Sequence, residues 1–211
     1  MSQSEQLQRG IAQLGISLSQ NTQAALLRFL VLLQKWNKVY NLTAIRDPQQ
    51  MVSHHLLDSL AVLPHLWPKR WLDVGCGPGL PGLVLAISKP EWEFSLLDSN
   101  SKKTAFVQQA IIELELHNVA VHCARVEDWQ SAEKFDGIIS RAFTELGNFL
   151  RCTRHLAAQQ GRWVAMKGKS EQKLADIPKG CRIEQVIPLQ VPGLNAARSL
   201  VIATCEENKA T

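Results

Sequence analysis

The chain has 211 residues, of which 45% are hydrophobic and 20% charged, and these values are ordinary for a globular enzyme with one domain and a modest addition. No apolar run reaches the roughly 18 residues that a membrane helix needs, and the N-terminus has neither a basic region nor an apolar signal core. The net charge of +4 permits an anionic partner without requiring one. We therefore expect a cytoplasmic protein that spans no membrane.

The cysteines and histidines argue against a metal site. Five cysteines are scattered along the chain without a C-x-x-C pair, and this pattern predicts reduced thiols with no disulfide framework. The six histidines complete no ligand set with them. His54 and His55 are interpreted as a structural pair on a helix surface. We expect no metal.

Residues 1–67 form the first predicted unit, a helical region that packs on the rest of the protein. Apolar residues recur at steps of three and four in two segments, which predicts two amphipathic helices with a turn at Asp47-Pro48 between them. A weaker helix is predicted over 3–14. Trp36 and Tyr40 lie at core spacing, so we expect them to pack these helices onto the sheet rather than to stack on RNA.

Residues 68–205 form the second predicted unit, in which short apolar runs alternate with amphipathic ones. Such alternation predicts a parallel sheet with helices on both faces. No convincing helix separates the last two strands, so they should form an antiparallel hairpin.

The predicted fold is α/β, a Rossmann-like sheet of seven strands with the last one antiparallel, as in class I methyltransferases that use S-adenosylmethionine (AdoMet), plus the N-terminal helical extension. Residues 206–211 are predicted to be a disordered tail. The predicted strands are 70–74, 93–98, 118–123, 136–140, 161–167, 182–190 and 198–204, and the predicted helices are 81–88, 101–116, 145–158 and 170–176.

A glycine-rich loop follows the first of these strands. The strand over 70–74 runs directly into Gly75-Cys76-Gly77-Pro78-Gly79-Leu80-Pro81-Gly82, and the second strand ends in Asp98. Glycine lets the backbone approach a bound nucleotide and adopt positive φ, and an acid at the end of the neighbouring strand can accept hydrogen bonds from ribose hydroxyls. This layout predicts a cofactor that contains a nucleoside.

Two cofactor classes fit this loop. Residues 77–82 match the G-x-G-x-x-G pattern of dinucleotide-binding proteins, and Asp98 lies at about the expected distance. Residues 73–79 match the acidic D-x-G-x-G-x-G loop of AdoMet methyltransferases. Asp73 suits a sulfonium and an ammonium and would repel a pyrophosphate on the helix N-terminus, so we favour AdoMet over NAD. Asp73 either contacts the methionine part or only caps loop amides, and Gly82 is interpreted as a close-packing position.

The next strands of the sheet are followed by further candidate site residues, because ligands bind at the carboxyl ends of parallel strands. Arg125-Val126-Glu127 follows the third strand, with an acid that can accept from an adenine amino group. Ser140-Arg141-Ala142-Phe143 follows the fourth, where enzymes that methylate exocyclic amines place a Pro-Pro-aromatic segment. No cysteine lies in a context suited to carbon-5 methylation. The remaining chemistry is attack by a lone pair that needs no deprotonation, such as guanine N7.

Such a reaction needs substrate positioning rather than a general base. We therefore assign Arg125, Arg141 and Lys167 as the catalytic residues, in the sense that they position the substrate. Together with Arg198 they would donate to phosphates and to guanine O6.

Six segments of the chain carry motifs of one known family. They are Lys35–Thr43, His55–Ser59, Val74–Gly82, Leu97–Ser99, Arg125–Glu127 and Ser140–Phe143. Together they resemble the RsmG or GidB family of bacterial 16S ribosomal RNA guanine-N7 methyltransferases, and the match runs from about residue 10 to residue 204. The resemblance implies AdoMet-dependent methylation of guanine N7 in the decoding-region loop of 16S rRNA, within the 30S subunit or an assembly intermediate, by a cytoplasmic and monomeric enzyme.

The same resemblance assigns the cofactor contacts by position. It implies contacts at Gly75, Leu80, Val126, Glu127 and Arg141, and it makes Asp98 the ribose-binding acid. With Asp73, Gly77 and Gly79 of the loop, these are the expected cofactor-binding residues.

Three other functions stay open from the sequence. A small-molecule methyltransferase would use the N-terminal helices as a lid, and a non-enzymatic nucleotide-binding module would associate with RNA. A nicotinamide-dependent oxidoreductase would use the G-x-G-x-x-G pattern. The chain has no Tyr-x-x-x-Lys pair for that chemistry, because Tyr40 is its one tyrosine.

Overall fold

The computed structural model describes residues 1–67, 69–168 and 176–206. In chain order, its helices and strands are α1 (Gln3–Gln13), α2 (Gln20–Tyr40), α3 (Pro48–Met51), the π-helix η1 (Val52–Leu57), α4 (Asp58–Leu60), the 3-10 helix η2 (Leu63–His65), β1 (Arg70–Val74), α5 (Gly82–Ser88), β2 (Glu93–Asp98), α6 (Ser101–Glu113), β3 (Val119–Cys123), β4 (Phe135–Arg141), α7 (Leu146–Thr153), the 3-10 helix η3 (Arg154–Leu156), β5 (Ala157–Gly168), β6 (Cys181–Leu189) and β7 (Arg198–Cys205).

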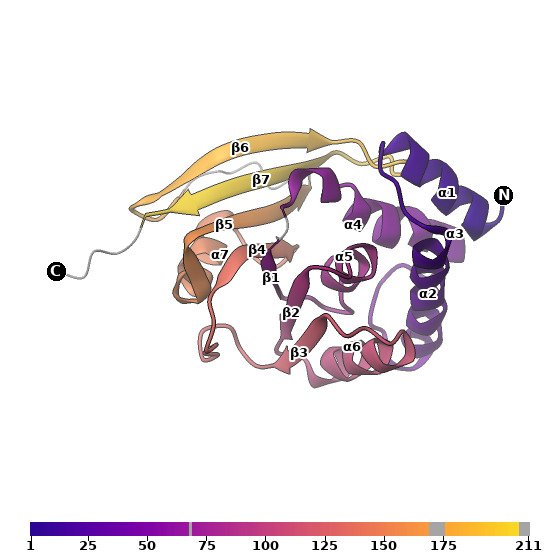
Figure 1. Ribbon diagram of the computed structural model, residues 1–211, viewed down its shortest axis with the longest axis horizontal. Helices are drawn as coiled ribbons and strands as arrows, with labels where there is room; N and C mark the ends of the chain where they lie inside the picture. The colour runs from indigo at the N-terminus through magenta and orange to yellow at the C-terminus, as the bar shows by residue number, and fades with distance from the viewer. Residues whose placement is uncertain (68, 169–175, 207–211) are drawn as a thin grey trace.

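The strands form one seven-stranded sheet in the order β3-β2-β1-β4-β5-β7-β6 (Figure 1). β1 pairs in parallel with β2 and β4, whereas β7 runs antiparallel to both β5 and β6. This topology confirms the predicted fold class, including the reversed last strand. Because strand order reverses at β1 and β4, their carboxyl ends lie where α/β sheets bind ligands.

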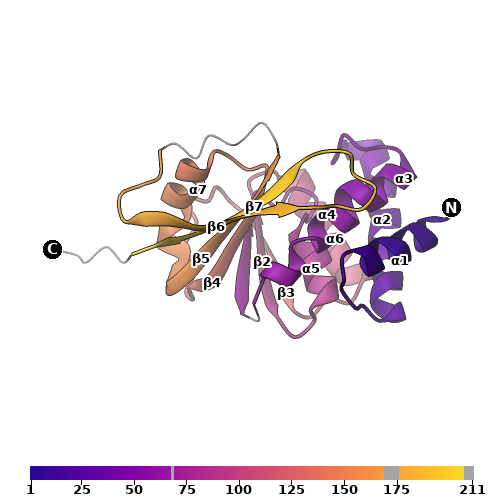
Figure 2. The same cartoon turned by 90° about the horizontal axis from the view of Figure 1, so that it is seen from above.

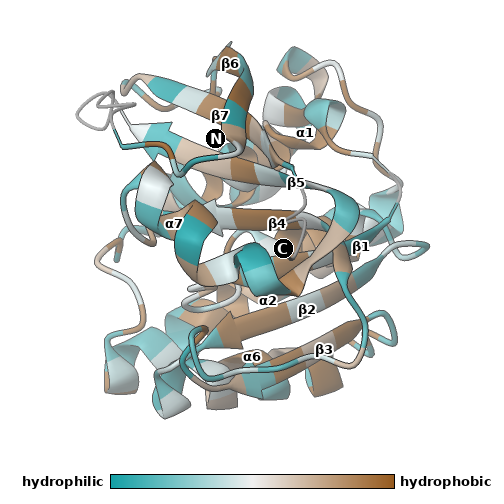
Figure 3. Cartoon of the chain, turned by 90° about the vertical axis from the view of Figure 1, so that its left-hand side faces the viewer, coloured by the Kyte–Doolittle hydropathy of each residue, from teal (hydrophilic) through white to brown (hydrophobic). Residues whose placement is uncertain are grey.

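Helices cover both faces of the sheet, with α7 on one face and α5, α6 and the N-terminal helices on the other (Figure 2). Successive residues of β1 alternate between the two hydrophobic cores, since Trp71 packs in the larger core and Leu72 in the smaller. Gly137 on β4 makes room for Trp71, because a Cβ there would lie 2.5 Å from the indole ring. Figure 3 shows hydrophobic strands between helices with hydrophilic segments. None of the helices described has the length and apolarity needed to cross a membrane.

The N-terminal helices pack mainly on other helices. The ring of Trp36 lies 5.7 Å from the ring of Phe106 on α6, so this side chain packs on a helix that covers the sheet. The ring of Tyr40 lies 5.2 Å from that of Trp36 at a tilt of 34°, but Tyr40 stays 44% exposed. The expected packing role is therefore right for Trp36 and wrong for Tyr40, which lies one turn further along at the exposed end of α2.

Several predicted boundaries differ from the structure. The helix predicted over 145–158 ends in η3 at Leu156, and residues 157–158 begin β5. The continuous helix predicted beyond Asp47-Pro48 is broken into α3, η1, α4 and η2. The helix predicted over 170–176 falls almost wholly outside the described residues, and the disordered tail does so beyond Glu206.

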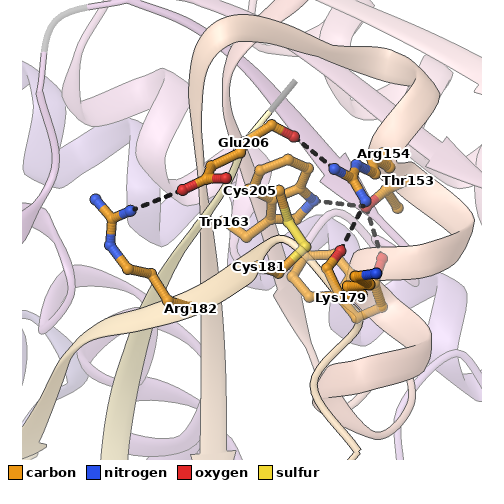
Figure 4. The surroundings of a disulfide bond; sticks show 9 residues. Thr153, Arg154, Trp163, Lys179, Cys181, Arg182, Cys205 and Glu206 are labelled. Carbon is orange, nitrogen blue, oxygen red and sulfur yellow. Dashed lines mark hydrogen bonds and ion pairs between the residues drawn. A yellow bond between two sulfur atoms is a disulfide. The ribbon is translucent and has the colours of Figure 1, made fainter. Parts of the chain in front are cut away.

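The expectation of five reduced cysteines is wrong at one pair. Cys181 and Cys205 form a disulfide across the β6–β7 hairpin, where they are direct partners in the antiparallel register (Figure 4). They lie 24 residues apart in sequence, and only the pairing of the two strands brings them together. Cys76, Cys123 and Cys152 are free.

Candidate cofactor and RNA site

The glycine-rich loop after β1 needs the glycines it has. Gly75, Gly77 and Gly79 have φ values of +67°, +55° and +82°, in the region that side chains rarely adopt. The Gly75 N–H donates to Leu97 O on β2 at 2.8 Å, which fixes the loop against the sheet. A Cβ on Gly75 would lie 2.6 Å from the ring of Phe143, so this glycine also lets the β4 side of the site approach the loop.

Asp98 holds the loop and the start of α6 at the same time. One carboxylate oxygen accepts from the Gly77 N–H at 2.8 Å, and the other accepts from the Asn100 N–H at 2.8 Å. Each oxygen keeps a further lone pair, because a carboxylate accepts about four hydrogen bonds. Asp98 can therefore position the loop and still accept from ribose hydroxyls.

A cavity of about 270 Å³ lies at this edge of the sheet. It brings together five of the predicted site residues, namely Gly75, Asp98, Arg125, Val126 and Glu127. Its remaining lining adds Lys103 and Phe143, which sequence reasoning did not assign to the cofactor. The full lining is Val74, Gly75, Leu97, Asp98, Ser99, Lys103, Ala124, Arg125, Val126, Glu127, Ala142 and Phe143.

Asp73 lies behind the loop and does not line this cavity. It is fully buried, and its Oδ2 accepts from the Gly82 N–H at the start of α5 at 2.7 Å. A Cβ on Gly82 would lie 2.7 Å from the same oxygen, so Gly82 is the close-packing position that the sequence predicted. The capping contact of Asp73 is thus present, while a contact with the methionine part stays a prediction.

Burial raises the pKa of Asp73 to about 7, and the hydrogen bond from Gly82 opposes this shift only in part. Its Oδ1 has no hydrogen-bond partner among the described residues. A cationic group bound near the loop would favour the ionised carboxylate. Asp73 therefore fits a positively charged cofactor.

The remaining loop residues of the predicted set shape the turn without lining the cavity. Gly77 and Gly79 supply the turn's backbone, and the Leu80 N–H donates to Cys76 O at 2.8 Å. Leu80 is 2% exposed and precedes a cis peptide to Pro81. Their cofactor contacts stay predictions.

The donors and charges around the loop fit AdoMet better than a dinucleotide. A pyrophosphate on the N-terminus of α5 would need the Gly82 N–H, but Asp73 already binds that group. Asp98 and Glu127 add two carboxylates to the cavity lining, and this negative charge suits a cofactor that carries positive charge better than one that carries a pyrophosphate. No group of three or more metal-ligating side chains occurs in the part of the chain that the structure describes.

The three predicted positioning residues are cationic, and one of them reaches the cavity. Arg125 lines it, whereas Arg141 and Lys167 do not. The buried Lys167 Nζ donates to Thr144 O at 2.7 Å. Ala142 follows Arg141 with φ +54°, an uncommon value for alanine, and this turn places Phe143 against the loop. The three predicted positioning residues are therefore spread over the edge rather than gathered in one cavity.

Arg141 is directed toward the N-terminal helices. Its Nη1 donates to His54 O at 2.9 Å and to Asp58 Oδ2 at 3.0 Å. Asp58 is a residue that sequence reasoning missed, although it lies in the segment His55–Ser59 that carries part of the family resemblance. An acid that directly follows two leucines in such a segment was the sequence signal that could have identified it.

His55 corrects the interpretation of a surface pair of histidines. Its side chain is 4% exposed and shares a hydrogen bond of 3.0 Å with the Thr43 hydroxyl, whereas His54 is only partly buried. Burial lowers the pKa of His55 to about 4, and the nearby Arg141 guanidinium adds to the shift. His55 is therefore neutral near pH 7.

Comparison with known structures supports the fold. The chain matches a variant of MtNAS in complex with S-adenosylmethionine with a TM-score of 0.59 at 14% identity, covering 85% of this chain and 75% of that one. It matches TrmN from Thermus thermophilus with a TM-score of 0.56 at 15% identity, covering 73% and 53%. At these identities the likeness establishes the fold and nothing more.

Comparison of sequences establishes the family. The chain is 50% identical to ribosomal RNA small subunit methyltransferase G of Laribacter hongkongensis, over 95% of this chain and 98% of the relative. It is 51% identical to the protein of that name from Stutzerimonas stutzeri, over 95% of each chain. The family model GidB, rRNA small subunit methyltransferase G, matches residues 22–201. The chain therefore belongs to the GidB family of rRNA small subunit methyltransferases.

Proposed function

We propose that this protein transfers the methyl group of AdoMet to N7 of a guanine in the decoding-region loop of 16S rRNA. The observation that carries the proposal is the cavity after β1, β2 and β3, where the Gly75 turn, Asp98 and Glu127 meet in a chain of the GidB family. The substrate is 16S rRNA in the 30S subunit or an assembly intermediate, and the enzyme acts as a monomer in the cytoplasm.

The residues of the cavity bind and orient the cofactor. Bound AdoMet supplies a methyl group made electrophilic by its sulfonium. Asp98 accepts hydrogen bonds from the ribose hydroxyls, and Glu127 accepts from the adenine amino group. Val126, which is 5% exposed, provides an apolar surface for the ring. Gly75 and its neighbours let the backbone come close to the methionine part.

The cations position the RNA, and no residue needs to remove a proton. Guanine N7 carries a lone pair and no hydrogen, so the rate depends on orientation and proximity. The neutral, buried His55 is not required as a base. Arg125, Arg141 and Lys167 donate to phosphates and to guanine O6 and stay away from N7 itself, because a cation there would disfavour the positive charge that the base gains on methylation.

The test is methyl transfer to ribosomal particles. The protein is incubated with radiolabelled AdoMet and 30S subunits from cells that lack it, and the 16S rRNA is then treated with borohydride and aniline, which cleave at N7-methylguanine. We expect label in 16S rRNA and one new cleavage site in the decoding-region loop. Subunits from cells that contain the protein are the control and should take up little label. Label in RNA without cleavage would contradict the N7 assignment, and label only in small molecules would contradict an RNA substrate.

A further inference from the structure

Asp58 is a buried acid that binds two arginines outside the cofactor cavity. Its side chain is 2% exposed, and it begins the short helix α4. Oδ2 accepts from Arg141 Nη1 at 3.0 Å, and Oδ1 accepts from Arg198 Nε at 3.0 Å. The two guanidiniums come from the end of β4 and the start of β7, and both bind the carboxylate of Asp58.

The π-helix η1 gives Arg141 a second fixed contact. The Asp58 N–H donates to Ser53 O and His55 O and bypasses His54 O, which would be its acceptor in a regular α-helix. That carbonyl accepts from Arg141 Nη1 at 2.9 Å instead. The irregular helix therefore supplies a backbone acceptor and a carboxylate to one guanidinium, which fixes its orientation.

The group carries more positive than negative charge. Two guanidiniums share one carboxylate, and Asp58 is the acid that pairs with either of them in the described ranges. Bringing a second guanidinium to the same carboxylate adds repulsion between the arginines, which a bound anion would relieve. The side chains of Arg141 and Arg198 are 22% and 25% exposed, so an anion can reach them.

The two arginines lie at the edge of the sheet that also carries the cofactor cavity. Arg198 pairs with Gly168 at the carboxyl end of β5, and a Cβ on Gly168 would lie 3.8 Å from Arg198 Nη1. The Nε of Arg198 donates to Asp58 and its Nη1 donates to Ala197 O, whereas its Nη2 has no acceptor among the described residues. A guanidinium held in this way presents a donor to a phosphate, whose geometry it matches well.

We propose that Asp58, Arg141 and Arg198 form a binding site for one backbone phosphate of the RNA substrate. Arg198 contacts the phosphate, and Asp58 is a positioning residue that holds the two guanidiniums side by side. This inference rests on the proposed function, because it assigns the site to RNA bound next to the cofactor.

The salt dependence of RNA binding tests the site. Each phosphate contact to single-stranded RNA contributes about 0.7 to the slope of log affinity against log salt concentration. With 16S rRNA transcribed in vitro as the probe, we expect Arg198→Gln to weaken binding and to reduce the slope by about 0.7, whereas Arg198→Lys keeps the slope. The AdoMet affinity of Arg198→Gln should stay within about twofold of the wild-type value.

Arg182→Gln is the matched control. Arg182 lies on the same hairpin at its other end, opposite Thr204, and its side chain is 65% exposed. Its removal should leave the slope unchanged. Weaker RNA binding by Arg198→Gln at an unchanged slope would reduce Arg198 to a structural role and overturn the site, as would an equal loss of slope in Arg182→Gln.

Asp58→Asn tests the positioning role. It keeps the size of the side chain but removes the charge that holds the two arginines, and we expect it to lower the slope as Arg198→Gln does. Tighter RNA binding by Asp58→Asn would mean that Asp58 only masks the cations and would overturn its role. If this variant does not fold, Arg198→Gln and its control still decide the site. Failure of wild-type protein to methylate RNA would instead contradict the proposed function.

Discussion

The two halves of the site are built from different kinds of contacts. The cofactor half, at β1 and β2, is formed by backbone turns and by Asp98, which binds groups within a few tens of residues of itself. The proposed RNA half, at β4 and β7, is formed by the long cationic side chains of Arg141 and Arg198, which the N-terminal helices hold through Asp58. The cofactor half is therefore organised by the sheet itself, whereas the RNA half depends on residues 1–67. In this proposal the N-terminal helices are part of the site and not only a cover for it.

Each half also contains a buried titratable group whose pKa is shifted, Asp73 in one and His55 in the other, and burial shifts these two pKa values in opposite directions. The pKa of Asp73, beneath the glycine-rich loop, is raised to about 7. The pKa of His55, beside Arg141, is lowered to about 4. In both cases burial disfavours the charged form. The free energy of unfolding therefore falls with rising pH because of Asp73 and falls with decreasing pH because of His55, over overlapping ranges of pH.

Asp98→Ala should have the largest effect and should act on the cofactor half alone. It removes the acceptor for the Gly77 and Asn100 amides as well as the ribose contact. We expect AdoMet affinity to fall on the order of 100-fold, or about 3 kcal/mol, in isothermal titration. Asp128→Ala, an exposed acid nearby that does not line the cavity, is the control and should bind normally. Unchanged affinity in Asp98→Ala would contradict the assigned cofactor site.

Asp73→Asn should change how stability depends on pH. Folded Asp73 keeps its proton up to about pH 7, whereas the unfolded chain releases it near the ordinary value of 3.8, so this residue makes the protein less stable as pH rises from about 4 to about 7. Asparagine can still accept from Gly82 without a charge. Urea unfolding without cofactor should show that the stability of the variant rises relative to wild type across this range, by up to about 1.4 kcal/mol per pH unit. Parallel pH profiles for the two proteins would contradict the buried carboxyl.

His55→Gln should show a smaller change of the opposite sign. The unfolded chain binds a proton at His55 near the ordinary value of 6.5 and the folded chain only near 4, so this residue makes the protein less stable as pH falls through that range. Glutamine keeps a partner for Thr43 and cannot titrate. We expect the variant to lose less stability than wild type as pH falls, by up to about 1.4 kcal/mol per pH unit over this narrower range. A variant as acid-sensitive as wild type would show that His55 is not buried in its neutral form.

The cofactor half could be predicted from the sequence because its signals are local. The turn at Gly75 directly follows a strand, and Asp98 ends the next strand, so spacing alone places them together. Arg125 and Arg141 were also placed at this edge of the sheet by position, since one follows β3 and the other ends β4, while their roles stay predictions. For Asp73 the sequence left two interpretations open, contact with the methionine part or capping of loop amides. A sequence pattern does not show from which backbone amide a buried acid accepts a hydrogen bond.

The RNA half depends on contacts that no local pattern encodes. Asp58 and Arg198 are 140 positions apart, and only the placement of α4 beside the sheet makes them partners. His55 was misplaced because its burial depends on the packing of η1 against the segment around Thr43, which the sequence alone does not show. The Cys181–Cys205 bond was missed for a similar reason, because it follows from the register of a hairpin.

The most direct test of the division into a cofactor half and an RNA half measures the binding of both ligands by two variants. AdoMet affinity and the salt dependence of 16S rRNA binding are determined for Asp98→Ala and for Arg198→Gln. The account predicts that Asp98→Ala loses AdoMet binding and keeps the RNA salt slope, while Arg198→Gln keeps AdoMet binding and loses about 0.7 from the slope. Loss of both properties in each variant would contradict a site made of two separately organised halves.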